Sequence, residues 1–427
     1  MTIRRLAVLL SLTLLVSVGH AAAQDQPPRE TAPPESWTHF TYKFGVDYML
    51  QVSARRDYAI HDQTFQDDET FAWWRLRPRM TGKSRHIDFI VEGQDTHGAG
   101  GSFSSRKAWL DLLNAFTDVK AGKNLVVRIG RQQADFEVLG RMVRTSDFVA
   151  VIRSFDVVQG TWRHAGTDLR ASFLKPVDSL PTTFNRQKQG ERLWTVYGRR
   201  VIAPRTAIQS YVIARHNDEV PSEAGVPGRA DVYAWLFQFD GPTPTHRVTW
   251  TIETVLERGH YSTDDVRAHG LFMRGEVELG RGYSVDARYN VTSGDAAKGD
   301  GVRGQFDTFY GAANVYGALG QFRGSNLRNF NVGGPIPITK TVTLNLRYWN
   351  THLTTRHDIW YGAVGPNIVN PAPTSLFAGQ ELASVLSWQA TPKTLVRTGY
   401  FQFVPGAYAQ SAKGNPYELR LQIIGGI

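Results

Sequence analysis

Three arginines alternate with apolar side chains in the stretch FAWWRLRPRMTG, residues 71–82. Successive side chains of an extended strand point to opposite faces. Arg75, Arg77 and Arg79 therefore share one face, while Leu76 and its apolar neighbours share the other. A guanidinium pairs with a carboxylate through two parallel hydrogen bonds, so a row of arginines is a binding surface for carboxylate anions. The chemistry predicted here is recognition of anions, provided that water reaches the arginine face.

Other segments with the same alternation carry further arginines on their polar side. These are Arg128, Arg170, Arg288, Arg347 and Arg420, with Lys43 joining them. Acidic residues share the polar sides: Asp47, Asp88, Glu92, Glu253, Glu276, Glu278, Asp286 and Glu418. One interpretation is that the cations concentrate anions along a pathway. The other is that they pair with the acids and brace a wall, and each interpretation can hold for different residues.

The first 23 residues have the pattern of an export signal. Two arginines precede an apolar run at residues 6–18, and Ala-Ala-Ala at residues 21–23 offers a small-residue cleavage site. We expect cleavage after Ala23, which lowers the formal net charge from +9 to +7. Residues 24–37 are a Pro-rich leader. No later stretch has the ~18 consecutive apolar residues that a spanning helix requires.

The rest of the chain alternates between apolar and polar residues, and its composition of 40 Gly, 22 Phe, 16 Tyr and 11 Trp suits a large β-protein. The first segment alternates from Phe40 to Val52. That is longer than the five or six residues of an average soluble strand, and it suits a tilted membrane strand. With this segment we count about eighteen strands, the others being 69–81, 85–95, 106–115, 124–133, 154–164, 167–175, 191–202, 206–216, 229–240, 245–257, 268–280, 283–293, 326–333, 341–351, 380–390, 393–403 and 416–424.

Long and short connections between these segments take turns along the chain. The long ones are 53–68, 96–105, 134–153, 176–190, 217–228, 258–267, 294–325, 352–379 and 404–415. The short ones are 82–84, 165–166, 203–205, 241–244, 281–282, 334–340 and 391–392, and 116–123 is intermediate. Outer-membrane barrels have short periplasmic turns and long extracellular loops. We therefore predict an all-β fold, a single transmembrane antiparallel barrel spanning residues 38–427, in the outer membrane of a Gram-negative cell.

The barrel interpretation places the arginine face in water. A charge facing lipid at mid-membrane costs about 2–4 kcal/mol for Arg or Lys, so Arg75, Arg77 and Arg79 are predicted to face the lumen. A barrel this wide has an interior that side chains cannot fill. Several aromatic residues are expected at the membrane interfaces: Trp74, Trp109, Trp194, Trp235, Trp250, Trp349, Trp360 and Trp388. Of the tryptophans, Trp73 and Trp349 fall on the lumen side, where they could stack on sugar rings.

One stretch resembles the signature region of the alginate export family of outer-membrane proteins: RIGRQQADFEVLGRMVRTSDFVAVIRSFDVV, residues 128–158. It contains the motifs Gly-Arg-Gln, Gly-Arg and Arg-Ser-Phe-Asp in the family's order. Residues 309–333 and 379–408 are also similar to the family. The resemblance implies an eighteen-stranded barrel that lets an anionic polysaccharide cross the outer membrane. Loop 134–153 is either a solvated external loop or a loop that folds inward as a constriction. The resemblance favours the second, with pore-lining roles for Arg131, Arg141, Arg153 and Asp156.

Motifs for catalysis are missing from the sequence, which has no HExxH, GxSxG or P-loop pattern. The acids and glycines of residues 294–301 lack the spacing of a calcium loop and suit an external loop. We expect no catalytic residues, no metal, no cofactor and no nucleic-acid partner.

Three functions are left open by the sequence. The first is a passive, arginine-lined channel for anionic solutes that exports an anionic, alginate-like polysaccharide. The second is an anion-selective diffusion porin for small organic acids, and the third is a structural or adhesive surface barrel with a closed lumen. The expected partners are outer-membrane lipid, the anionic polysaccharide or small anions, and periplasmic polysaccharide-secretion proteins.

Overall fold

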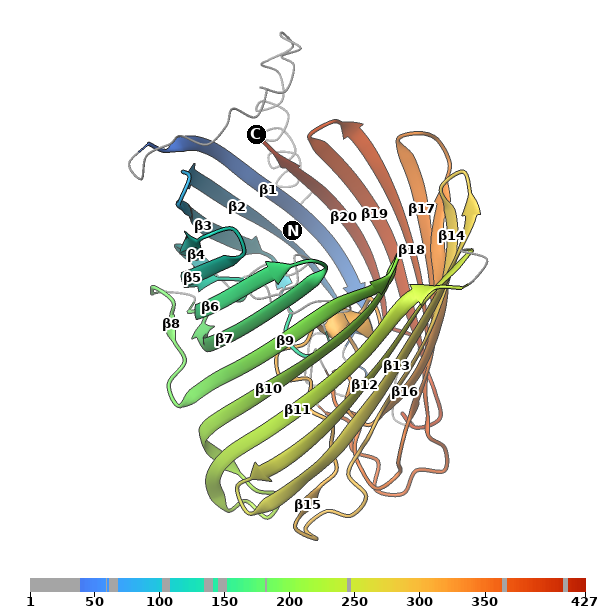
Figure 1. Ribbon diagram of the computed structural model, residues 1–427. Coiled ribbons are helices and arrows are strands. Elements are labelled where there is room, and N and C mark those ends of the chain that lie inside the picture. The colour runs from blue at the N-terminus through green and yellow to red at the C-terminus, as the bar shows by residue number, and fades with distance from the viewer. Residues whose placement is uncertain are drawn as a thin grey trace.

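A computed structural model describes residues 39–58, 60, 68–101, 108–133, 141–144, 152–180, 183–243, 247–362, 367–409 and 414–427. The predicted export signal and the whole Pro-rich leader, residues 24–37, lie outside the described residues. The chain forms one barrel of long tilted strands (Figure 1). These strands are β1 (Thr41–Arg56), β2 (Glu69–Lys83), β3 (Ile87–Ala99), β4 (Ala108–Ala121), β5 (Leu125–Gln132), β6 (Phe155–His164), β7 (Thr167–Asp178), β9 (Glu191–Ala203), β10 (Thr206–Pro221), β11 (Pro227–Pro242), β12 (Val248–Tyr261), β13 (Asp264–Gly280), β14 (Tyr283–Thr292), β16 (Leu327–Pro337), β17 (Val342–Leu353), β18 (Phe377–Thr391), β19 (Thr394–Pro405) and β20 (Tyr417–Gly426).

The barrel closes because the first strand pairs with the last. β1 is antiparallel to β2 on one side and to β20 on the other, with Asp47 opposite Gly426 and Arg56 opposite Tyr417. Each other long strand pairs antiparallel with its neighbours in the chain. Two further strands, β8 (Arg186–Gln187) and β15 (Val302–Arg303), have two residues each and stand outside this ring of eighteen. The predicted eighteen-stranded antiparallel barrel is thus confirmed.

The two faces of β2 show how the strands are placed. Phe71, Trp73 and Arg75 are buried on the inner face, and Arg77 and Arg79 follow on the same side. Leu76 is 42% exposed on the outer face, where the bilayer lies. Outer faces all around the barrel expose large apolar side chains because lipid takes the place of a protein core there.

Connections at the two ends of the barrel differ as predicted, with two exceptions. The predicted long connections 217–228 and 258–267 are wrong: β10 runs to Pro221 before β11 begins at Pro227, and only residues 262–263 join β12 to β13. The strands continue past the apolar alternation because a backbone ladder does not require an apolar face outside the bilayer. The intermediate connection 116–123 is a tight turn at residues 122–124, and the predicted turn at 334–340 is shorter, at residues 338–341.

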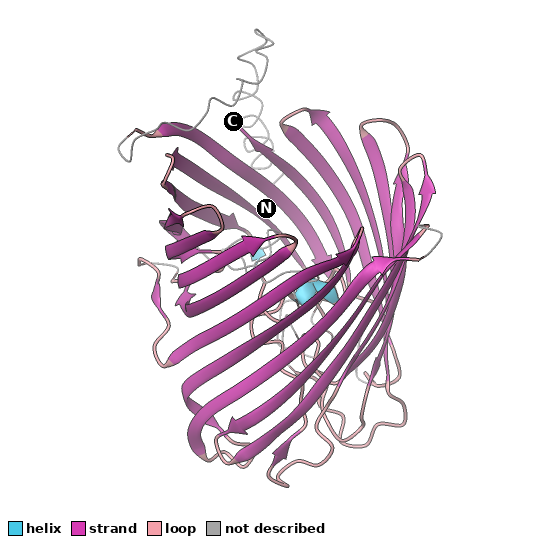
Figure 2. Cartoon of the chain, in the orientation of Figure 1, coloured by secondary structure: helices cyan, strands magenta, loops and turns pink. Residues whose placement is uncertain are grey.

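Residues 304–326, here called the inner segment, fold into the barrel after β15. Its 3-10 helix η2 (Ala313–Val315) lies inside the ring of strands (Figure 2). Phe306, Leu319 and Phe322 of the segment are almost completely buried against inward-facing wall residues. The expected water-filled interior is therefore occupied by protein at the loop end, because an inward-folded loop supplies side chains that the wall alone lacks. No helix among the described residues has the length and apolar character needed to cross a membrane.

Candidate functional site

Six of the predicted pore arginines lie on inward-facing positions between the turn end and the middle of their strands. They are Arg77 and Arg79 of β2, Arg128 of β5, Arg170 of β7, Arg288 of β14 and Arg347 of β17. All six are only partly covered by protein, so their guanidinium groups reach the lumen. The strand period places them there, since each is an even number of residues from a buried inward side chain of its own strand. Whether they line a conducting pore stays a prediction.

Asp286 of β14 holds several of these guanidiniums together. Arg288 donates from Nε to Asp286 Oδ2 at 2.5 Å, and Arg347 of β17 pairs with the same carboxylate. Arg274 of β13 approaches Asp286 at 3.4 Å and donates to Glu276 at 2.6 Å. Asp286 is buried on the wall, whereas the three arginines are partly exposed. In this group three guanidiniums stand against two carboxylates, so one positive charge is in excess.

The other inward arginines also have acidic neighbours. Arg128 makes two charge-assisted hydrogen bonds to Asp118, at 2.6 and 2.7 Å. Arg77 and Arg79 share Asp47 at 3.3 and 3.5 Å. A further pair joins Arg170 to Asp168 at 2.8 Å. The bracing interpretation thus applies in part, because these acids fix the orientation of guanidiniums that still have exposed N–H groups.

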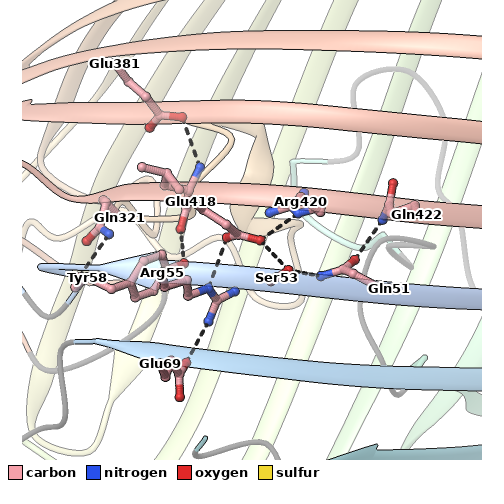
Figure 3. A network of polar contacts seen from close by, with 11 residues as sticks. Gln51, Ser53, Arg55, Tyr58, Glu69, Gln321, Glu381, Glu418, Arg420 and Gln422 are labelled. Atoms are coloured by element: carbon pink, nitrogen blue, oxygen red, sulfur yellow. Dashed lines mark hydrogen bonds and ion pairs between the residues drawn. The ribbon is translucent and has the colours of Figure 1, made fainter. Parts of the chain in front are cut away.

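The seam between β1 and β20 contains a network of polar contacts (Figure 3). The fully buried Glu418 accepts hydrogen bonds from Arg420 at 2.7 Å, Arg55 at 3.0 Å and Ser53 at 2.8 Å. Gln422 donates to Gln51 across the same seam at 2.8 Å. Arg420 lies inward as predicted. Its partner Glu418 also binds Arg55 and Ser53 of β1, so this group of side chains links the two strands that close the barrel.

Arg75 differs from its neighbours on β2 because it is 4% exposed. Its guanidinium lies 5.9 Å from the ring centroid of Trp73, two residues earlier on the same face. Arg75 faces inward but offers almost no surface to a solute. Within the predicted arginine row, Arg77 and Arg79 are the residues that reach water.

Inward-facing wall residues hold the inner segment through backbone hydrogen bonds. Glu257 of β12 accepts from the Asp307 N–H at 3.0 Å, and Glu381 of β18 accepts from the Leu319 N–H at 3.0 Å. Arg215 of β10 pairs with Asp307 at 2.6 Å. These strands lie on different sides of the ring, so the segment crosses the lumen near the loop end (Figure 1).

An aromatic cluster packs the same segment against loop 354–376 and β19. Phe322 stacks on Trp360 with ring centroids 4.6 Å apart and planes 6° apart, and Phe403 meets both rings edge-on at 5.9 Å. The Trp360 indole N–H donates to the Gln321 carbonyl at 2.9 Å. Trp360 was expected at a membrane interface; that prediction is wrong because this tryptophan is 1% exposed inside the barrel. Trp349 also faces inward and is 6% exposed.

Two arginines of the predicted inward loop contact the inner segment or the wall behind it. Arg141 is buried, lies 3.5 Å from Glu253 of β12 and stacks on Phe272 at 4.1 Å. Arg153 lies over Tyr310 at 4.7 Å and is exposed toward the lumen. Neighbouring protein displaces part of the water around the Arg153 guanidinium, and this partial desolvation lowers the pKa of Arg153. Arg144 of the same loop is exposed, and its backbone N–H donates to the Tyr310 carbonyl at 3.1 Å. The acidic residues of the loop, Asp135, Glu137 and Asp147, lie outside the described residues.

Arg131 and Asp156 lie on the outward side of the barrel, which corrects the expected pore-lining position. Ile129 is 54% exposed and Val158 is 48% exposed on the outer face, and Arg131 and Asp156 are each two residues from them. Their carboxylate–guanidinium pair, at 2.8 Å, lies beside the segment that contains Asn185. Arg131 still belongs to β5, which ends at Gln132, so the alternation of side chains along the strand decides which way it points. Because Ile129 faces outward, Arg131 faces outward too.

The sequence had not indicated the wall residues that hold the inner segment. One signal for them is a strand that is apolar on both faces: β11 buries Val232, Ala234 and Leu236 inward while Trp235 and Phe237 face out. An inner face that met only water would be polar, so an apolar inner face indicates that protein packs against it. Within the described part of the chain, no group of three or more His, Cys, Asp or Glu side chains is arranged to hold a metal ion.

Comparison with known proteins identifies the relatives of this barrel. A family model described as Alginate export matches residues 40–420. Among solved structures, the chain is similar to Pseudomonas aeruginosa OpdK with vanillate, at TM-score 0.62 and 12% identity, covering 90% of this chain and 98% of that one. It is also similar to Acinetobacter baumannii OccAB4, at TM-score 0.58 and 10% identity, with 90% and 98% covered.

Curated protein sequences include no match to this chain. At these identities the solved structures establish the fold alone, which is that of an outer-membrane barrel. The family model covers nearly the whole barrel, from the first strand to the last. The chain therefore belongs to the alginate export family of outer-membrane β-barrel proteins.

Proposed function

We propose that the barrel is a passive outer-membrane conduit through which an anionic, uronate-containing polysaccharide is exported. The observation that carries the proposal is the set of six inward guanidiniums between the turn end and the inner segment, formed by Arg77, Arg79, Arg128, Arg170, Arg288 and Arg347. Membership of the alginate export family supports a uronate polymer as cargo.

Guanidiniums that already have acidic neighbours can still bind a moving anion. An arginine has five N–H donors, and a carboxylate engages only two of them in a bidentate pair. Three arginines, for example, surround Asp286 and only Glu276 adds a second carboxylate, so a passing carboxylate meets N–H donors in excess of those that two acids engage. Weak binding at several sites suits conduction, because a polymer must leave each site as easily as it enters.

The inner segment would act as a constriction in this proposal. It crosses the loop end of the lumen, and Arg153 faces the remaining space beside Tyr310. A polymer chain that leaves the cell must pass or displace this segment. We propose no catalytic step, since passage through the barrel requires only positioning and electrostatics.

A second candidate is a diffusion porin for small organic acids. The narrowing by the inner segment favours it, and so does the similar fold of OpdK, whose crystal structure contains vanillate. In that case the same guanidiniums would bind single carboxylates. The third candidate, a structural barrel with a closed lumen, predicts that no steady current crosses the protein at all.

Planar-bilayer recordings distinguish the three candidates. Under a KCl gradient the proposed conduit gives a steady current with a reversal potential that favours chloride, and Arg77→Glu with Arg79→Glu reduces or reverses that preference. Soluble polygalacturonate should interrupt the current in discrete events, whereas the small-acid porin is blocked only by monomeric carboxylates. Unchanged reversal potentials in the double variant would remove these arginines from the pathway.

The partners of export are also proposals. Anionic polysaccharide would be delivered by periplasmic secretion proteins, and the Pro-rich residues 24–37 would lie on that side of the membrane because β1 starts at the turn end. Cleavage of residues 1–23 during export to the outer membrane belongs to the same proposal.

A further inference from the structure

The short turns of the barrel carry basic residues and no acidic ones. Eight turns join the strands at this end, and together they contain seven Lys or Arg and no Asp or Glu. The seven, here called the turn cations, are Arg85, Lys123, Arg205, Arg247, Arg281, Lys340 and Lys393. They come from seven different turns, so they are distributed around the whole periplasmic rim.

All seven turn cations are exposed to solvent. None of them has an ion pair with another described residue. In this respect they differ from six inward arginines of the wall, which all have an acid within 4 Å: Arg77, Arg79, Arg128, Arg170, Arg288 and Arg347. Among the described residues, the turn cations are therefore not neutralised by ion pairs.

The opposite end of the barrel is balanced. Its nine connections contain twelve acidic and twelve basic residues. Residues 1–37 contain three arginines and three acids, so the formal net charge of +9 belongs entirely to residues 38–427. The turn cations supply seven of those nine charges. The connections at the two ends of the barrel thus differ in net charge, +7 at the turn end against 0 at the loop end.

Turn geometry does not explain the basic residues. Ala165 and Gly166 build the turn between β6 and β7 with φ of 45° and 77°, and Arg281 and Gly282 build the turn between β13 and β14 with φ of 53° and 82°. The same two-residue turn thus forms with alanine or with arginine. A positive φ favours Gly, Asn or Asp over arginine, so the arginine is present for what its charge does.

We infer that the turn cations are the capture surface for the polyanion, which enters the barrel from the periplasmic side. The inference rests on the proposed function, which already sets the direction of passage, and adds to it the residues of first contact. Exposed cations around a mouth raise the local concentration of an oppositely charged solute and its association rate. The polyanion would meet the turn cations first and the inward arginines of the wall after it has entered the lumen.

Screening sets the range of this attraction. The Debye length is about 8 Å at physiological salt, so each turn cation acts mainly on polymer segments already near the rim. A long polyanion has many charges and meets several turns together, whereas a single small acid meets one. The rim therefore discriminates by chain length, which the inward arginines of the wall alone would not do.

The test uses full-length protein in planar bilayers, with soluble polygalacturonate added to one side at a time. Because the chain has no cysteine, a single Thr263→Cys in the exposed β12–β13 connection reports the orientation of each inserted barrel with a membrane-impermeant thiol reagent. The measured quantity is the rate of current-blocking events from each side. One variant replaces all seven turn cations with Gln, and the matched control replaces three exposed cations of the loop end, Arg186, Lys298 and Arg356.

We expect the wild-type block rate to be higher from the turn side. Neutralising the seven turn cations should lower that rate at least about tenfold, within the 10–10³ range of electrostatic steering, without changing block from the loop side. The loop-end control should behave as wild type. An unchanged rate in the seven-fold variant, or an equal fall from both sides, overturns the inference.

Three further outcomes are decisive. If wild type is blocked from neither side, the proposed polysaccharide function fails, whereas block that ignores the turn cations refutes only the capture surface. If neutralisation matters only in bilayers that contain anionic phospholipid, the turn cations serve lipid headgroups and the inference is wrong. Should the seven-fold variant fail to fold, wild type alone still decides: raising KCl from 0.1 to 1 M shortens the Debye length from about 10 to 3 Å and must suppress turn-side block selectively.

Discussion

The role of the inner segment can be tested at Phe322. Its ring is 2% exposed, stacks on Trp360 at 4.6 Å and meets Phe403 edge-on at 5.9 Å. Phe322→Ala removes this contact without touching the β-ladder of the wall. The barrel should therefore remain closed while the inner segment loses its principal apolar contact with loop 354–376 and β19.

The size of the effect follows from burial. Replacing a buried phenylalanine with alanine typically costs about 3–5 kcal/mol, including the cavity that remains. Because 1.36 kcal/mol corresponds to a factor of ten, the displaced form of the inner segment should gain roughly two to three and a half powers of ten in population relative to the docked form. The hydrogen bonds from Leu319 to Glu381 and from Asp307 to Glu257 would still oppose displacement.

Single-channel recording measures the consequence. Phe322→Ala should give a larger mean conductance, or frequent transitions to a larger conductance level, because the segment no longer stays across the lumen. Phe330→Ala is the matched control. It removes the same side chain from the outer face of β16, where Phe330 is 43% exposed and faces away from the inner segment. Heat-modified migration on electrophoresis checks that both barrels are folded. A folded Phe322→Ala barrel with wild-type conductance and noise would refute the idea that the inner segment limits passage.

Other predictions concern charge, sidedness and closure of the wall. Asp286→Asn should shift the reversal potential further toward the chloride value, because three arginines lose their shared carboxylate; a shift toward potassium would contradict the placement. Leu76→Arg, on the lipid face, should lower the free energy of unfolding in bilayers by about 2–4 kcal/mol, whereas Asn345→Arg, which faces the lumen, should change it little. Glu418→Gln should destabilise the seam by roughly 3–5 kcal/mol, since it leaves Arg55 and Arg420 beside an uncharged partner; an unchanged thermal unfolding temperature would argue against this network as a closure element.

Much of the wall could be predicted from sequence because alternation is a local property. In β2 the inward side is set by each residue's own position in the strand, so the placement of Arg77 and Arg79 needed no knowledge of distant segments. The same rule, applied to Ile129, would have placed Arg131 on the outer face. That error came from treating a motif as a functional unit although it crosses from a strand into a loop after Gln132.

The inner segment could not be placed by the same reasoning. Its docking depends on partners far away in the chain, such as Glu381 for Leu319 and Arg215 for Asp307. A loop with apolar residues and a strand with two apolar faces indicate that something packs inside, but neither indicates which loop meets which strand. The loop-end extensions of the hairpins β10–β11 and β12–β13 could not be predicted from the apolar pattern either. Backbone pairing continues there beyond the apolar alternation.

The placement of guanidiniums around an aqueous lumen is tested most directly by single cysteines along β2 in this otherwise cysteine-free chain. Residues 76–79 are changed to cysteine one at a time, and single-channel current is recorded while a water-soluble, negatively charged thiol reagent is added. We predict that the current changes at positions 77 and 79 and stays constant at positions 76 and 78. Reaction at positions 76 and 78, or a current that no position affects, would contradict the account.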